Sequence, residues 1–146
     1  MGQVSMHNPV VVSGNSDADY SAKQYYLYDI EATTGNVKLC AAAGARIAGV
    51  LMDKPSAADI PCLLATGGVV PCVAGGTVTA GDYITCDANG KGVTATGSYT
   101  DTQAGSATDA LIGPYVIGIA RTGCSSGEQF ALLITHAGAV NTTPAA

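Results

Sequence analysis

Two segments of the chain carry the same series of short apolar runs and turns in the same order. The first copy spans about residues 24–68 and the second about residues 81–138. Each copy ends on a closely matched run, "CLLATGG" in the first and "ALLITHAG" in the second. An internal repeat of this kind restricts the chain to folds that can be built from two copies of one supersecondary unit.

Both copies open with the sequence signature of a β-hairpin. In the first copy, the run Tyr25 to Ile30 is followed by "TTGN" and then Val37; in the second, the run Tyr83 to Cys86 is followed by "DANG" and then Val93. Apolar runs that flank a glycine-bearing turn favour two antiparallel strands. The later runs "RIAGVLM" and "YVIGIAR" each hold a glycine between apolar residues, which indicates a bulge or a close approach of two backbones.

Composition points to the same fold class. The chain has 19 glycines, no Trp, a single Phe and only 12% charged residues, so its core has to be built from small and β-branched side chains. Such side chains favour sheet over helix. Turn signals recur at roughly eight to twelve residues, which predicts about eight to ten short strands. We therefore predict an all-β protein, a small β-sandwich or β-barrel (β-tulip-like) built from the internal repeat.

The regions outside the repeat define the expected domain organisation. Residues 1–23 are polar and loosely patterned, with breaks at Pro9 and Gly14, and predict an extended N-terminal arm. A disordered end and an arm that becomes ordered on a partner are both compatible with this pattern. Residues 24–140 are expected to form a single β-domain, and residues 141–146 a frayed C-terminal tail.

Charge and hydropathy argue against several classes of partner. The net charge is −5, and the six Lys and Arg residues are scattered along the chain, so we expect no direct binding of nucleic acid. The apolar runs are far shorter than the ~20 residues of a membrane-spanning helix, so we expect no membrane partner. The chain starts without a basic and then apolar leader, which predicts synthesis in the cytoplasm without secretion.

The chain offers little material for catalysis. His7 lies in the expected arm and His136 at a strand end, and neither has a local partner. In "GCSSG", Ser126 directly precedes Gly127, which is the wrong frame for a nucleophile elbow. In "DANGKG", Lys91 occupies the place of the third oxygen donor of a calcium loop. We therefore predict no catalytic residue, no metal site and no cofactor, and expect that the protein is not an enzyme.

The cysteines are expected to be buried reduced thiols. There are five of them, an odd number at wide spacings and without a C-x-x-C motif. One pair leaves an alternative open: a hairpin centred on Gly67 would place Cys62 opposite Cys72, where they could form a disulfide.

Four of the seven tyrosines cluster in "YSAKQYYLY". In a strand, Tyr26 and Tyr28 would share one face and Tyr25 the other, so at least one ring should be only partly covered. Two interpretations follow: core packing with a hydroxyl at the rim, or a contact surface for another chain. Under the second interpretation, the candidate interface residues are Tyr20, Tyr25 and Tyr26.

The order of these motifs resembles a known family. The run "VVPCVAGGTVTAGDYITCDANGKGVTA", preceded by "IAGVL" and followed by "VIGIA", is similar to the capsid decoration, or cement, proteins of tailed bacteriophages. The resemblance covers Tyr25 to Ala137, and its first half also resembles, more weakly, the head decoration protein of phage lambda. The five cysteines and the long connection from Thr96 to Gly113 depart from the family pattern.

The resemblance implies a structural virion protein on the outer surface of the capsid. Such proteins are small β-domains, often trimeric, that bind the major capsid protein, stabilise the expanded head, and commonly lay an N-terminal arm along it. The resemblance implies no enzyme activity. The apolar part of the arm, Pro9, Val10, Val11 and Val12, is the candidate capsid-binding segment, because an extended segment can add to an exposed sheet edge. A homotrimer would strengthen binding by avidity.

Two other classes of function stay open at this point. A carbohydrate-binding or adhesin-like β-module is one, although such sites usually use aromatic platforms and the chain has no Trp. A small hydrolase or other enzyme on a β-scaffold is the second, and the sequence shows no convergent acid, base and nucleophile for it.

Overall fold

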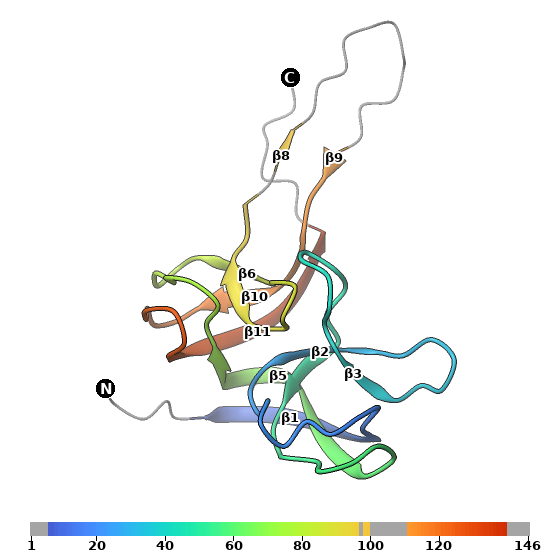
Figure 1. The fold of residues 1–146 in the computed structure, drawn as a ribbon. Coiled ribbons are helices and arrows are strands. Elements are labelled where there is room, and N and C mark those ends of the chain that lie inside the picture. The colour runs from blue at the N-terminus through green and yellow to red at the C-terminus, as the bar shows by residue number, and fades with distance from the viewer. Residues whose placement is uncertain (1–5, 97, 100–110, 140–146) are drawn as a thin grey trace, which may run out of the picture.

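The structure is a computed structural model that describes residues 6–96, 98–99 and 111–139, and this part of the chain is all-β (Figure 1). Nine strands form one sheet, which curls into a barrel-like body, and two more form a separate pair that projects from it (Figure 1). The strands of the sheet are β1 (His7–Asn15), β2 (Leu27–Ile30), β3 (Val37–Leu39), β4 (Gly49–Leu51), β5 (Pro61–Val73), β6 (Tyr83–Cys86), β7 (Gly92–Thr94), β10 (Tyr115–Ala120) and β11 (Gln129–Ala139). The separate pair is β8 (Ser98–Tyr99) and β9 (Leu111–Ile112). The prediction of an all-β, barrel-like fold is confirmed.

None of the residues described here lies in a helix long and apolar enough to span a bilayer.

The strand order reflects the internal repeat. It runs β3-β2-β4-β5-β11-β10-β6-β7, so the first four strands and the last four occur in mirrored order around the central pair of β5 and β11. Within each half, a hairpin (β2 with β3, or β6 with β7) packs beside a strand that leads into the central pair. Both predicted hairpins are confirmed. β1 lies outside this scheme and pairs with β5.

Two glycines occupy matching positions in the two halves. A Cβ atom added to Gly49 in β4 would overlap the carbonyl oxygen of Ala65, and one added to Gly118 in β10 would overlap that of Leu133. Each glycine therefore allows its strand to lie unusually close to the central strand beside it. This is the close backbone approach that the glycine-interrupted runs predict.

The expected hairpin at Gly67 does not form. β5 is one strand of 13 residues, and its direction continues through Gly68, whose φ is 82°. Cys62 lies opposite Gly14 of β1, whereas Cys72 lies opposite Phe130 of β11. The alternative of a disulfide between Cys62 and Cys72 is therefore wrong, and all five cysteines are free thiols.

The buried side chains form two clusters. The larger one fills the barrel-like body with small and β-branched residues around Phe130. The smaller one consists of Tyr20, Tyr28, Val37, Leu51, Cys62 and Leu64. The smaller cluster changes the expected domain boundary, because Tyr20 belongs to it and β1 belongs to the sheet. The β-domain thus includes much of the segment that the sequence assigned to an arm at residues 1–23.

Candidate interaction surface

β1 is an added strand at the margin of the sheet. It runs antiparallel to β5, with Asn15 opposite Pro61 and Val12 opposite Leu64. Within the described part of the chain, β5 is the only strand with which β1 pairs, so the opposite edge of β1 presents unpaired backbone N–H and C=O groups. Such an edge is a template for pairing with another chain.

The side chains of β1 add an apolar surface to this edge. The chain exposes seven large apolar side chains among the described residues, and five of them lie on β1, directly before it, or on the facing part of β5. These five are Met6, Val10, Val11, Val12 and Leu63, with exposed fractions from 43% to 57%. We call this group the β1 surface. Neighbouring residues of a strand point to opposite sides, so these side chains lie on both faces of β1 beside its free edge. Exposed apolar side chains along a free strand edge make it a candidate interaction surface.

The local sequence explains why β1 is a strand although it is exposed. Its three consecutive valines have β-branched side chains that favour extended backbone. The buried Ser16 anchors its end: the Ser16 hydroxyl donates a hydrogen bond to the Ala57 carbonyl at 2.7 Å, and its N–H donates to the Ile60 carbonyl at 2.9 Å. Pro9, which has no N–H to donate, lies where the register with β5 shifts. Hydrogen bonds of Ser16 therefore hold the C-terminal end of β1 in place, while the valine side chains of β1 stay exposed.

The three candidate interface tyrosines do not form one surface. Tyr20 is only 7% exposed and packs edge to face against Tyr28, and its hydroxyl accepts a hydrogen bond from the Leu39 N–H at 3.2 Å. Burial raises the pKa of Tyr20. In this structure its ring is part of the core, so Tyr20 is removed as a candidate contact residue. Tyr25 and Tyr26 are half-buried, and an interface role for them stays a prediction.

His136 has a structural environment that the sequence did not reveal. Its Nδ1 lies 3.1 Å from the Tyr115 hydroxyl and its Nε2 lies 3.0 Å from the Thr66 carbonyl oxygen. The tautomer that carries its hydrogen on Nε2 donates to Thr66 and accepts from Tyr115. The imidazole therefore links β10 and β11 to β5 with both ring nitrogens in use. Local sequence gives no signal for this, because Thr66 and His136 are 70 residues apart.

The remaining candidates for chemistry are metal-ligating side chains and thiols. Within residues 6–96, 98–99 and 111–139, there is no group of three or more His, Cys, Asp or Glu side chains that could hold a metal ion. One pair of thiols is chemically distinctive. A hydrogen bond from Cys40 lowers the pKa of Cys86 to about 7, and the same contact raises the pKa of Cys40. Both side chains are buried, so they form an internal pair rather than an exposed nucleophile.

Comparisons with known proteins identify the fold. No family model matches the chain, and no curated protein sequence is significantly similar to it. The structure nevertheless belongs to a class of small all-β, barrel-like domains that includes a solved example. That example is the N base of the head fiber gp8.5 of bacteriophage phi29, which superimposes with a TM-score of 0.60. The match covers 88% of this chain and 95% of the other, at 17% sequence identity, and shows a shared fold.

Proposed function

We propose that the protein is a structural component of a tailed-phage virion that decorates and stabilises the outside of the head by binding the major capsid protein. The observation that carries this proposal is the fold, which is shared over 88% of the chain with the base of a phage head fiber. The order of sequence motifs that resembles capsid decoration proteins is compatible with the same role. The proposal includes a homotrimer, and it includes no catalytic activity.

The β1 surface is the part of the molecule that we assign to capsid binding. Its free edge offers main-chain hydrogen bonds to an extended segment of another protein, and Val10, Val11 and Val12 supply apolar contacts beside that edge. This is the physics of strand addition, in which the backbone gives affinity and the side chains give specificity. One short strand gives a modest affinity, and three linked copies would raise the apparent affinity through effective concentration.

The proposal is tested by co-sedimentation of the protein with phage heads that lack it. We expect the full chain to sediment with the heads and a variant lacking residues 1–15 to stay in the supernatant. This truncation keeps Ser16 and Tyr20, and its fold is checked by circular dichroism and thermal unfolding. A matched control is Tyr83→Glu, which changes an exposed apolar residue (44% exposed) on β6 rather than on the β1 surface.

Each result has a defined meaning. If the full chain does not bind heads, decoration is wrong. If the folded truncated chain binds as well as the full chain, the assignment of β1 is wrong. Sedimentation equilibrium of the free protein, together with imaging of decorated heads, tests the trimer: three-fold density over the capsid supports it, and isolated single copies contradict it.

A further inference from the structure

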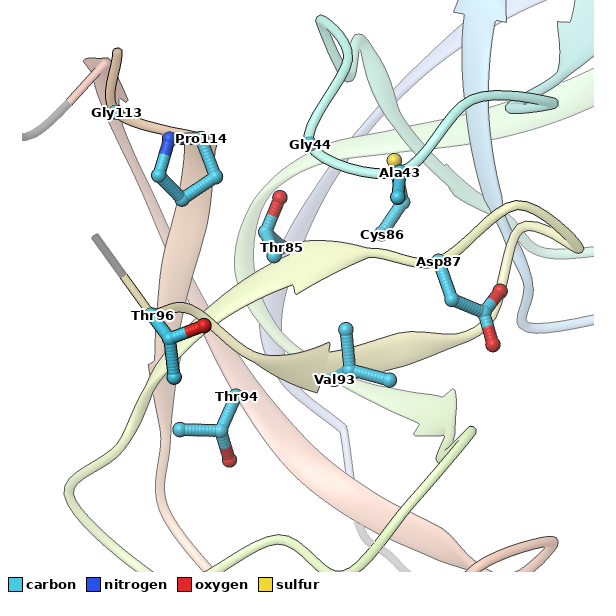
Figure 2. A pocket seen from close by; sticks show the side chains of 10 residues that line it. All are labelled: Ala43, Gly44, Thr85, Cys86, Asp87, Val93, Thr94, Thr96, Gly113 and Pro114. Carbon is cyan, nitrogen blue, oxygen red and sulfur yellow. The ribbon is translucent and has the colours of Figure 1, made fainter. Parts of the chain in front are cut away.

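A pocket of about 350 Å³ lies beside the hairpin of β6 and β7, away from β1 (Figure 2). Three parts of the chain form its walls: the loop at Ala43 and Gly44, the hairpin itself, and the residues Gly113 and Pro114 that lead into β10. Pockets of this size are large enough to enclose a small organic molecule. The proposed role in head binding makes no use of it.

One polar side chain in the pocket lining is almost completely buried. Thr85 is only 5% exposed, and its Oγ1 has no hydrogen-bond partner in the described part of the chain. Figure 2 shows this hydroxyl directed into the space bounded by Gly44 and Pro114. The neighbouring Thr94 differs, because its hydroxyl donates to the Asp82 carboxylate at 2.8 Å. A buried hydroxyl without a partner is unfavourable, so a polar group from outside the chain that reaches Thr85 Oγ1 through a small shift of the pocket wall would gain a hydrogen bond.

The charges around the pocket indicate a neutral occupant. No Lys or Arg is among the ten residues that line it, so nothing there would attract an anion. The one charged residue, Asp87, is occupied by its own turn: its Oδ1 accepts hydrogen bonds from the N–H groups of Asn89 and Lys91, both at 2.9 Å. A carboxylate used in this way adds negative potential that disfavours anions further.

The residues that line the pocket combine apolar side chains with hydroxyl groups, as contact with a sugar ring requires. Val93, Pro114 and Ala43 offer apolar contacts, which suit the C–H faces of a ring. The hydroxyls of Thr85 and Thr96 can each donate and accept, which suits ring hydroxyls that do the same. We propose that this pocket binds a neutral, hydroxyl-bearing small molecule of monosaccharide size, with the Thr85 hydroxyl bonded to a ligand hydroxyl. This inference does not rest on the proposed function.

The test is an NMR titration of the full chain with neutral monosaccharides, namely glucose, galactose and N-acetylglucosamine. We expect saturable shifts of the Thr85 and Val93 signals with at least one of them, and at least about tenfold weaker binding of the charged analogue glucuronate. Thr85→Val removes the hydroxyl at nearly constant volume and should weaken binding at least about tenfold. Thr85→Ser keeps the hydroxyl and should retain binding.

The control variant is Thr33→Val, which changes an exposed threonine in the turn between β2 and β3 and should bind as the unchanged protein does. The proposal is overturned if none of the neutral sugars shifts the pocket signals. It is also overturned if Thr85→Val, with its fold verified by the same spectra, binds as well as the unchanged chain. If only water bonds to the Thr85 hydroxyl, none of the neutral sugars will shift the pocket signals.

Discussion

Tyr20 and Tyr28 meet edge to face, with ring centroids 5.0 Å apart and an interplanar angle of 71°. The contact joins the segment that follows β1 to the first hairpin of the repeat. Because the Tyr28 hydroxyl also donates to the Lys23 carbonyl at 2.9 Å, the two rings fix the path of the chain between β1 and β2. The path of the chain between β1 and β2 is therefore held by an aromatic pair that lies outside β1 and β5.

This pair predicts a graded loss of stability. Tyr20→Ala removes a nearly buried ring and should lower the free energy of unfolding by about 3 kcal/mol. Tyr20→Phe removes only the hydrogen bond with the Leu39 N–H and should lower it by about 1 kcal/mol. Urea unfolding followed by circular dichroism measures both values. Equal stability of Tyr20→Ala and the unchanged protein would show that the ring is not part of the core.

The matched glycines predict matched effects of substitution. Gly49→Ala and Gly118→Ala each place a Cβ against a backbone carbonyl oxygen that cannot move aside without shifting β5 or β11. We expect each to lower the free energy of unfolding by about 3 kcal/mol, or to prevent folding. The control is Gly76→Ala, because a Cβ there meets no atom within 4 Å. Comparable thermal stability of Gly118→Ala and Gly76→Ala would contradict the close approach of the two strands.

Point substitutions separate the binding role of β1 from its structural role. Val10→Lys and Val12→Lys place charges on side chains that are 57% and 48% exposed, so the free energy of unfolding should change by no more than about 0.5 kcal/mol. Binding to phage heads should nevertheless fall sharply, because a lysine opposes burial against a partner. Thermal unfolding and co-sedimentation measure the two quantities. Stable variants that bind heads normally would remove these valines from the contact.

Removal of the unsatisfied hydroxyl should stabilise the free protein. Thr85→Val exchanges the hydroxyl for a methyl group within the pairing of β6 and β7, where Thr85 lies opposite Val93. We expect the free energy of unfolding to rise by about 1 kcal/mol in the absence of ligand. Urea unfolding measures it. A decrease of similar size would mean that the hydroxyl already has a stabilising partner in the free protein.

The thiol pair predicts a pH dependence. In the folded state Cys86 has a pKa lowered from 9.0 to about 7, so between these two values the unfolded state binds more protons than the folded state. The contribution of Cys86 to stability should therefore rise as the pH increases from 7 to 9, and be lost as the pH falls through 7. The pKa of Cys40 is raised above 9.0 in the folded state, so above pH 9 the folded state keeps a proton that the unfolded state has lost. The contribution of Cys40 to stability therefore falls as the pH increases in that range.

Thiolate absorbance near 240 nm and urea unfolding, each measured against pH, test this prediction. Cys86→Ser should abolish the titration near neutral pH and flatten the rise in stability. Cys40→Ala should raise the pKa of Cys86, because the main hydrogen bond that lowers this pKa is lost. A native thiolate titration that is unchanged in Cys40→Ala would rule out the coupling between the two thiols.

Local patterns in the sequence predicted the hairpins, because each depends on a turn and two short runs that are adjacent in the chain. The same reasoning failed at Gly67 and Gly68. Two glycines between apolar runs are typical of a turn, but here β1 and β11 provide pairing partners on either side of them, and the strand continues. The choice between a turn and a continuous strand depended on segments that are distant in sequence.

The candidate sites were also visible in the sequence only where they depend on neighbouring residues. The apolar run of Val10 to Val12 was visible in the sequence, although its pairing with β5 was not. Tyr20 follows a polar segment that is typical of a loop, and only its packing against Tyr28 reveals it as core. Thr85 is an ordinary strand residue in sequence. The lack of a partner for its hydroxyl is a property of the three-dimensional surroundings, which no local pattern carries.

The added strand β1 has one more consequence. The eight strands of the two halves that share the main sheet occur in mirrored order, so a body made from these strands alone would have two nearly equivalent ways of approaching another surface. β1 belongs to neither half, and it lies on the opposite side of the body from β8 and β9 (Figure 1). β1 therefore makes the two halves of the duplicated body inequivalent, so the two sides of the molecule differ in what they can bind.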